Sequence, residues 1–162
     1  MKVPAPHGSW VIVLSLIIAL MLSIMPLPEW ATVWRPEWAA MTLIYWCSAL
    51  PHRVGIAAGW TTGLAQDVLK DAMLGQHALG FCLIAYIAVR QHRRMELITI
   101  WQQTILVAIL VLITQIWNAW VRSVTGQPVG GWGMFYPVLT SGILWFWVCI
   151  ILRDIQHKLK VS

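Results

Sequence analysis

Small and acidic residues recur at helical spacing in one part of an otherwise apolar sequence, and this is where chemistry is most readily expected. Gly55, Gly59 and Gly63 follow one another at intervals of four, and Asp67 comes at the next interval. This spacing places all four on one face of a helix. A face of small residues lets a second backbone approach closely, which is a main source of helix association in lipid. The partner is either another helix of this chain, which we favour, or a different membrane protein.

Asp67 is the acid in this face, and an acid at or inside a membrane boundary is by default a functional candidate because its placement is costly. Two interpretations stay open. The carboxylate either lies at the outer interface or caps a helix, or it makes an internal polar contact with a neighbouring helix or with a partner. Asp71, one turn further on, is expected to be solvated.

A second polar face consists of Gln115, Asn118 and Arg122, at spacings of three and four residues. Side-chain amides in lipid need partners and supply interhelical hydrogen bonds of about 0.6 to 2 kcal/mol. We therefore predict that this face points into a helix bundle. His77 is expected at the same end of the helix bundle, on the outer side of the membrane. Asp67 and Arg122 either pair there or meet water separately.

Motifs for catalysis and for cofactor binding are lacking in the sequence. There is no HExxH motif or other clustered His, Cys, Asp and Glu set of the kind that binds zinc. Thr140-Ser141-Gly142 superficially resembles a serine nucleophile motif, but the first glycine of the pattern is missing and His77 is its only plausible base. No glycine-rich loop for nucleotide phosphates is present. The sequence predicts no enzymatic activity, no cofactor and no metal.

The composition shows in which surroundings these residues must work. Of 162 residues, 59% are apolar and 10% are charged, and the mean hydropathy is +0.72. Soluble domains carry roughly 25% charged residues. So few charges cannot cover a water-soluble globule, whereas lipid covers an apolar surface without cost. We conclude that the chain is an all-α membrane protein.

Uncharged runs between the charged residues divide the chain into candidate membrane spans. We predict one domain, residues 1–162, with six transmembrane helices in a compact bundle, at about 10–28, 34–50, 54–70, 72–89, 97–121 and 132–152. A helix needs about 20 residues to cross the hydrocarbon layer. The second and third runs are short, so these helices must extend, from near Trp34 or Arg35 and toward Asp71, or tilt. A re-entrant hairpin is less favourable, because it places Arg53 inside the membrane at a cost of several kcal/mol.

The distribution of Lys and Arg predicts the orientation of these spans. With a cytoplasmic amino terminus, the inner side holds eight such residues: Lys2, Arg53, Arg90, Arg93, Arg94, Arg153, Lys158 and Lys160. The outer side then holds three: Arg35, Lys70 and Arg122. This split follows the positive-inside rule. We expect both termini in the cytoplasm and basic cytoplasmic loops at Arg53 and at Arg90, Arg93 and Arg94. The net charge of +5 thus reflects topology and not binding of nucleic acid.

Several short motifs, taken in order, resemble the rod shape-determining protein MreD family over essentially the whole chain. They are Arg35-Pro36-x-Trp38, Leu50-Pro51-His52-Arg53, Gly63-Leu-Ala-Gln-Asp67-Val-Leu, Leu74-Gly75-x-x-Ala78-Leu79 and Trp101-Gln102-Gln103. The family more often has Asp-Leu-Leu or Asp-Leu-Phe where this chain has Asp67-Val68-Leu69, and the sequence beyond Gln103 is less typical of it.

The resemblance implies a non-enzymatic scaffold subunit of the elongasome in the bacterial inner membrane, needed for rod shape and lateral peptidoglycan synthesis. The partners it implies are MreC, RodA with its penicillin-binding transpeptidase, membrane lipid and, indirectly, MreB. It also implies a fold similar to the membrane substrate-binding subunit of energy-coupling-factor transporters. The alternative is a subunit that binds or transports a small molecule or a lipid-linked precursor. A scaffold would seal its polar interior, whereas a binding subunit would keep an open cavity of about 300 to 1,000 Å³.

Overall fold

The computed structural model describes residues 8–159, so Lys2 and Lys160, which contributed to the predicted orientation, lie outside the described residues. Its helices are α1 (Ser9–Ile24), α2 (Glu29–Thr32), α3 (Trp38–Ala49), α4 (Ile56–Leu69), α5 (Gln76–Leu97), α6 (Ile100–Val124), the 3-10 helix η1 (Trp132–Phe135) and α7 (Tyr136–Lys158). No strand occurs between residues 8 and 159. The predicted all-α fold is therefore confirmed.

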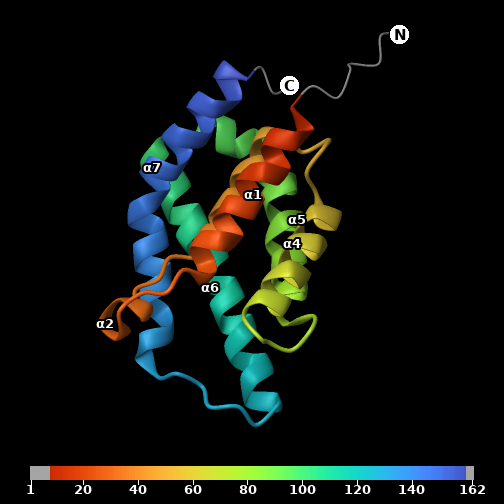
Figure 1. The fold of residues 1–162 in the computed structure, drawn as a ribbon. Coiled ribbons are helices and arrows are strands. Elements are labelled where there is room, and N and C mark those ends of the chain that lie inside the picture. Colours follow the sequence, from red (N-terminus) through yellow and green to blue (C-terminus); the bar gives the residue numbers. More distant parts are fainter. Residues whose placement is uncertain (1–7, 160–162) are drawn as a thin grey trace.

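The long helices run side by side along one axis (Figure 1). Helix α1 begins, α7 ends and α5 passes into α6 at one end of the bundle, whereas the α6–η1 connection lies at the opposite end. Helices α4 and α5 form the most extensively packed pair, and α6 packs along α7. The chain thus alternates in direction from helix to helix, which brings residues far apart in sequence to the same end.

Helix α3 lies at the centre of the bundle and contacts α1, α4, α5, α6 and α7. Every residue from 39 to 48 is buried. A helix that is apolar on all sides is stable only when protein surrounds it, and α3 meets this condition. The indole N–H of Trp46 donates to Ser15 Oγ of α1 at 2.8 Å, so even the polar atom of this large side chain is paired within the core.

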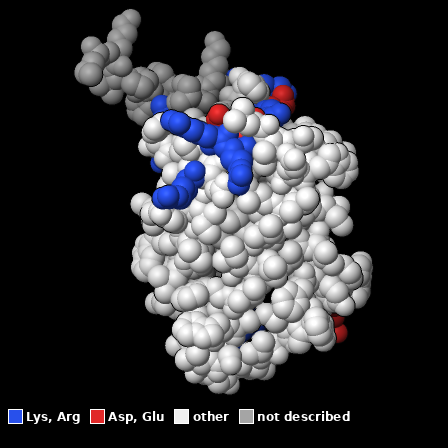
Figure 2. Space-filling model, turned by 180° about the vertical axis from the view of Figure 1, so that it is seen from behind, with Lys and Arg blue, Asp and Glu red and all other residues white. Residues whose placement is uncertain are grey.

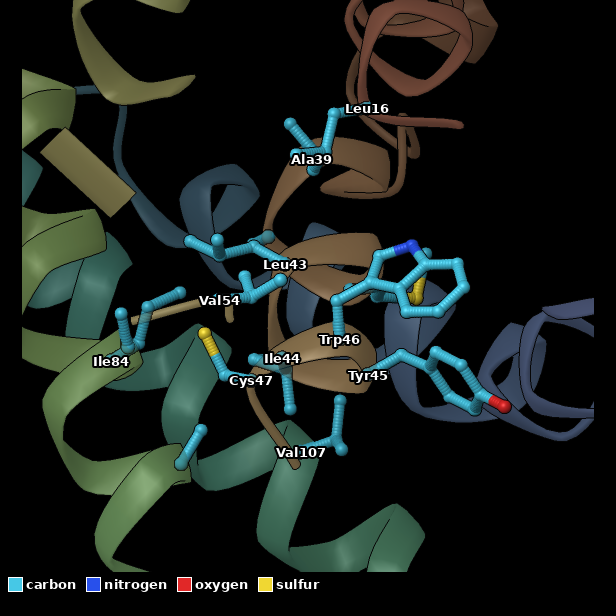
Figure 3. Close-up of a cluster of buried hydrophobic side chains, with 14 of the residues drawn as sticks. Leu16, Ala39, Leu43, Ile44, Tyr45, Trp46, Cys47, Val54, Ile84 and Val107 are labelled. Carbon is cyan, nitrogen blue, oxygen red and sulfur yellow. The ribbon is translucent and has the colours of Figure 1, made fainter. Parts of the chain in front are cut away.

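The core collects around α3 (Figure 3). Leu43, Ile44 and Cys47 from α3 lie among Ile84 of α5 and Val107 of α6, and all five are fully buried. Side chains from three helices therefore share one apolar cluster. The outer surface is also apolar, and its exposed residues include Ile17, Ile18 and Met21 on α1, Ile105, Ile109 and Ile116 on α6, and Ile143, Trp147 and Ile151 on α7. Such a surface is suited to contact with lipid.

The structure corrects the predicted start of the second span. We expected this helix to begin near Trp34 or Arg35, but α3 begins at Trp38. Pro36 explains the difference, because a proline disfavours helical backbone at the residue before it, here Arg35. The resulting helix has 12 residues, fewer than a lipid-exposed span requires. Its burial removes that requirement, because its backbone and side chains face protein instead of lipid.

Two helices in the described part of the chain are long and apolar enough to cross a membrane, namely Ile100–Val124 and the combined η1–α7 segment Trp132–Lys158. Helix α1 is apolar but shorter, at 16 residues. Helix α4 has 14 residues and ends at Leu69, without reaching Asp71. The membrane topology with six spans stays a prediction.

Candidate functional site

The glycine face of α4 lies against α5 of the same chain. A Cβ atom added to Gly59 would lie 2.7 Å from the backbone oxygen of Phe81, and one added to Gly63 would overlap with the backbone of Ala78. Gly55 differs, because it is the residue that precedes α4 and a Cβ there would meet nothing within 4 Å among the described residues. The close approach of the two helices therefore depends on Gly59 and Gly63.

Asp67, near the end of α4, caps the N-terminus of α5. Its Oδ2 accepts a hydrogen bond from the Gly75 N–H at 2.8 Å, and its Oδ1 accepts one from the His77 N–H at 2.8 Å. The first N–H groups of a helix have no partner within the helix, and an anion there also meets the positive end of the helix dipole. Asp67 is fully buried. Of the interpretations left open by the sequence, the geometry shows a helix cap that is also an internal contact.

The side chain of His77 takes part in the same arrangement. Its Nδ1 lies 2.8 Å from Asp67 Oδ1, and since a carboxylate is only an acceptor, Nδ1 carries the proton. Asp67 thereby fixes the orientation of the ring. The side chain is 4% exposed and lies at the edge of a cavity described below.

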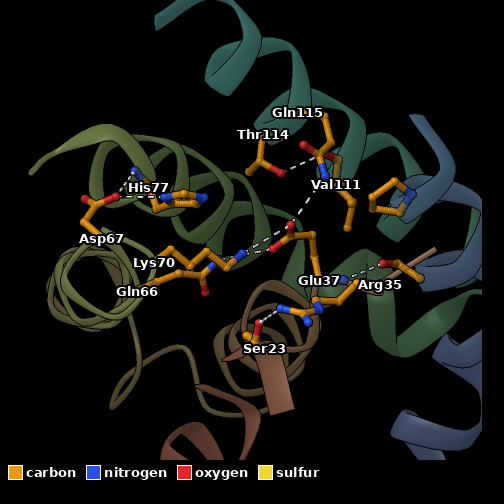
Figure 4. Close-up of polar contacts among 12 residues, drawn as sticks. Ser23, Arg35, Glu37, Gln66, Asp67, Lys70, His77, Val111, Thr114 and Gln115 are labelled. Carbon is orange, nitrogen blue, oxygen red and sulfur yellow. Dashed lines mark hydrogen bonds and ion pairs between the residues drawn. The ribbon is translucent and has the colours of Figure 1, made fainter. Parts of the chain in front are cut away.

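Glu37, directly before α3, joins three parts of the bundle (Figure 4). Its Oε2 accepts a hydrogen bond from Gln66 Nε2 at 3.3 Å, and its Oε1 accepts one from Gln115 Nε2 at 3.4 Å. The ammonium of Lys70 lies 3.7 Å from Oε1. The carboxylate is thus surrounded by donors from α4, from the residue after α4 and from α6.

The segment before α3 is tied down by its backbone and by an arginine. Arg35 donates from Nη1 to the Ser23 carbonyl and from Nη2 to the Met25 carbonyl, both at 2.6 Å. These carbonyls lie at the end of α1, where a cation is favoured by the helix dipole. The Glu37 N–H donates to Ser141 Oγ of α7 at 3.0 Å. Ser141 is therefore a structural acceptor in this fold.

A cavity of about 520 Å³ opens beside Glu37. Its polar lining includes Glu37, Lys70, His77, Gln115, Asn118 and Arg122. Residues of the connection between α6 and α7, among them Val129 and Met134, complete the lining. All four residues that the sequence suggested as polar bundle candidates, His77 and the three from α6, lie around this cavity. We call it the polar cavity.

Two buried polar atoms of the polar cavity's lining residues have no hydrogen-bond partner within the described residues. They are Asn118 Oδ1 and Arg35 Nε. Asn118 is 8% exposed. A buried polar atom without a partner is uncommon in folded proteins and calls for an explanation, and at the polar cavity a further polar group could supply the missing partners.

The structure does not form the pair between Asp67 and Arg122 that the sequence allowed. Asp67 is turned toward the first turn of α5 and has His77 as its ionisable partner. Arg122, near the end of α6, is exposed at the polar cavity instead. The first-turn N–H groups of α5 follow Asp67 closely in sequence, which gives the carboxylate a nearer set of donors. Asp71 is exposed, as expected.

The basic residues expected in cytoplasmic loops are all exposed: Arg53, Arg90, Arg93 and Arg94. Arg53 occupies a tight turn, in which its N–H donates to the Leu50 carbonyl at 3.0 Å. The other three do not form a loop, because α5 continues to Leu97. Arginine, glutamine and glutamate are good helix formers and no glycine or proline intervenes, so the helix extends past its apolar part. On the face in Figure 2, Lys and Arg gather toward one end of the molecule.

The four polar candidates could be predicted from the sequence, whereas Glu37 was missed. The partners Gln66 and Gln115 are 29 and 78 residues away from Glu37. Helical spacing relates residues on one helix and carries no information on contacts between helices so far apart in sequence. Gln66 gave a weak signal, since an amide beside Asp67 on an apolar helix also needs a partner.

Comparisons with known proteins agree with the resemblance seen in the sequence. The family model for rod shape-determining protein MreD matches residues 6–155. The rod shape-determining protein MreD of Haemophilus influenzae is 29% identical over 153 residues, which cover 94% of each chain. No solved structure matches the chain. The match over nearly the whole length shows that this chain belongs to the MreD family of non-catalytic, shape-determining integral membrane proteins.

Proposed function

We propose that the chain is a scaffold subunit of the elongasome in the bacterial inner membrane, where it holds MreC and supports lateral peptidoglycan synthesis. Membership of the MreD family supports this role. The structural observation that carries the proposal concerns Asp67. Its carboxylate is fully buried and accepts hydrogen bonds from N–H groups at the start of α5. An acid used in this way stabilises a helix arrangement and is not free for chemistry.

The proposed partners are MreC by direct contact, RodA with its penicillin-binding transpeptidase, and MreB indirectly. The proposed orientation has both termini and the exposed Arg53, Arg90, Arg93 and Arg94 on the cytoplasmic side. Exposed arginines there attract anionic lipid, at about 1 kcal/mol for each residue near the surface, and the excess of Lys and Arg at this end follows the positive-inside rule.

Affinity purification of the full-length chain from membranes in mild detergent tests the scaffold function. We expect MreC to co-purify with the unaltered protein and to be lost from Gly63→Leu, which separates α4 from α5. The matched control is Ala57→Leu, because Ala57 is exposed on the same helix. If MreC does not co-purify with the unaltered protein, or if the Gly63 variant accumulates normally and retains MreC, the scaffold proposal is wrong.

A second candidate function is the binding of a small molecule or of a lipid-linked precursor. The polar cavity favours it, because its volume of about 520 Å³ falls in the range of ligand pockets and several polar groups converge on it. The same purification tests this candidate when the sample is also searched for bound small molecules and lipids by mass spectrometry. Retention of a specific compound at stoichiometric amounts supports binding, and a sample free of any such compound contradicts it.

A further inference from the structure

The charges around the polar cavity do not balance. Glu37 is matched by Lys70, with 3.7 Å between the carboxylate and the ammonium, and also accepts from two amides. Arg35 is held by two backbone carbonyls, which carry no formal charge. The guanidinium of Arg122 forms no ion pair and no hydrogen bond with any residue from 8 to 159, and it is the backbone carbonyl of Arg122 that accepts from Thr125 Oγ1. Two guanidinium groups therefore remain without a counter-ion among the residues that line this cavity.

Buried polar atoms without hydrogen-bond partners place a second, independent requirement on any ligand of the polar cavity. Asn118 is one helical turn before Arg122, so both project from the same face of α6. The Oδ1 atom of Asn118 is a buried acceptor without a donor, and the Nε atom of Arg35 is a buried donor without an acceptor. A ligand that satisfies this site has to bring an acceptor with negative charge for the guanidinium groups and a donor for the amide oxygen.

We infer that the polar cavity binds a phosphate group that carries a neighbouring hydroxyl, with the phosphate at Arg122 and Arg35 and the hydroxyl donating to Asn118 Oδ1. Guanidinium groups match phosphate oxygens in a bidentate manner and are preferred over lysine for this purpose. A phosphate alone would leave the Asn118 oxygen unpaired, which is why the hydroxyl belongs to the inference. The inference rests on the second candidate function and not on the scaffold function.

Two sources supply this chemistry, namely a lipid headgroup and a water-soluble phosphate ester. Both are available with the same phosphoglycerol group, as phosphatidylglycerol and as glycerol 3-phosphate. The experiment uses the full-length protein in a non-ionic detergent and measures its thermal unfolding by tryptophan fluorescence, for which the chain offers 12 tryptophans. Ligand that binds only the folded state raises the unfolding temperature in a saturable way, from which an apparent Kd follows.

We expect saturable stabilisation by at least one probe, beyond that given by phosphatidylcholine micelles or by chloride at equal ionic strength. Stabilisation by phosphatidylglycerol alone identifies a lipid headgroup, and stabilisation by glycerol 3-phosphate identifies a soluble ester. The Arg122→Gln variant should raise the apparent Kd about ten- to a hundredfold, which is the loss of affinity expected when one hydrogen bond to a charged group is removed. Asn118→Leu, which removes the acceptor, should weaken it by about tenfold.

The matched control is Arg90→Gln, an exposed arginine on α5 outside the lining of the polar cavity. It should retain the affinity of the unaltered protein. No saturable effect of either probe, or an equal loss in the Arg122 and Arg90 variants, overturns the inference, because the latter result indicates unspecific attraction of anions. Co-purification of MreC is measured on the same samples, so failure of the ligand site and failure of the scaffold function are distinguished.

Discussion

One oxygen of Asp67 accepts two hydrogen bonds from His77, one from its backbone N–H and one from its ring, both at 2.8 Å. The residue directly before α5 is Gly75, which has no side chain to cap the helix. An acid eight residues earlier supplies the missing acceptor. The cap therefore also fastens α4 to α5, and the two helices are coupled at the end where the polar cavity lies.

The first prediction concerns the chemistry of Asp67. Asp67→Asn keeps an acceptor of the same shape and should retain part of the stability and of MreC binding. Asp67→Leu leaves the buried N–H group of His77 without its acceptor, at about 1 to 3 kcal/mol, and the partly buried N–H group of Gly75 loses its acceptor as well. Thermal unfolding, MreC co-purification and cell shape are measured at matched protein levels, and Asp71→Asn is the control because Asp71 is exposed with a φ of 49°. If Asn abolishes rod shape as completely as Leu while MreC still binds, the acid serves a solute or a proton and not the scaffold.

The second prediction compares Gly63, inside α4, with Gly55, the N-cap of the same helix. Gly63→Ala should destabilise the protein by about 1 to 3 kcal/mol, the usual cost of overpacking, because the new methyl group overlaps with the Ala78 backbone. Gly55→Ala should cost less, because the new methyl group finds open space and only the preference for glycine over alanine at a helix N-cap is lost. Thermal unfolding in detergent measures both. Equal tolerance of the two substitutions would show that α4 and α5 do not pack through this face.

The third prediction concerns the role of Glu37 as a joint between helices. Glu37→Leu leaves the amide donors of Gln66 and Gln115 without their acceptor, and each lost partner costs about 1 to 3 kcal/mol. Glu29→Leu, at an exposed acid of α2, should have little effect. Unfolding midpoints of the two variants give the comparison. A Glu37 variant as stable as the unaltered protein contradicts the hydrogen-bond network.

The fourth prediction tests the proposed orientation. Reporter fusions at Thr99, between α5 and α6, and at Ser162 should report the cytoplasm, and a fusion at Gly126 should report the outer side. The reason is the excess of Lys and Arg on the proposed inner side. An outward carboxyl terminus would exclude a six-span topology with a cytoplasmic amino terminus.

The all-α fold could be predicted from the composition and from the lengths of the uncharged runs. The glycine face and the polar face of α6 could be predicted because each depends on periodicity within one helix. Glu37 shows where this reasoning ends, since its partners on α4 and α6 are defined only by tertiary packing. The extension of α5 through Arg90 and Arg94 was missed for a related reason. Charge was taken as the sign of a loop, although arginines on a helix that passes beyond the apolar layer are solvated equally well.

The central place of α3 has a consequence for biogenesis. The helix is buried by α1, which is synthesised earlier, and by α4 to α7, which are synthesised later. When α3 leaves the ribosome, most of the surfaces that will enclose it do not yet exist. Its 12 residues are also too few to span lipid unaided. Helix α3 is therefore fully enclosed only when the carboxyl-terminal helices have been synthesised. A chain truncated before α7 lacks one of the helices that pack against α3.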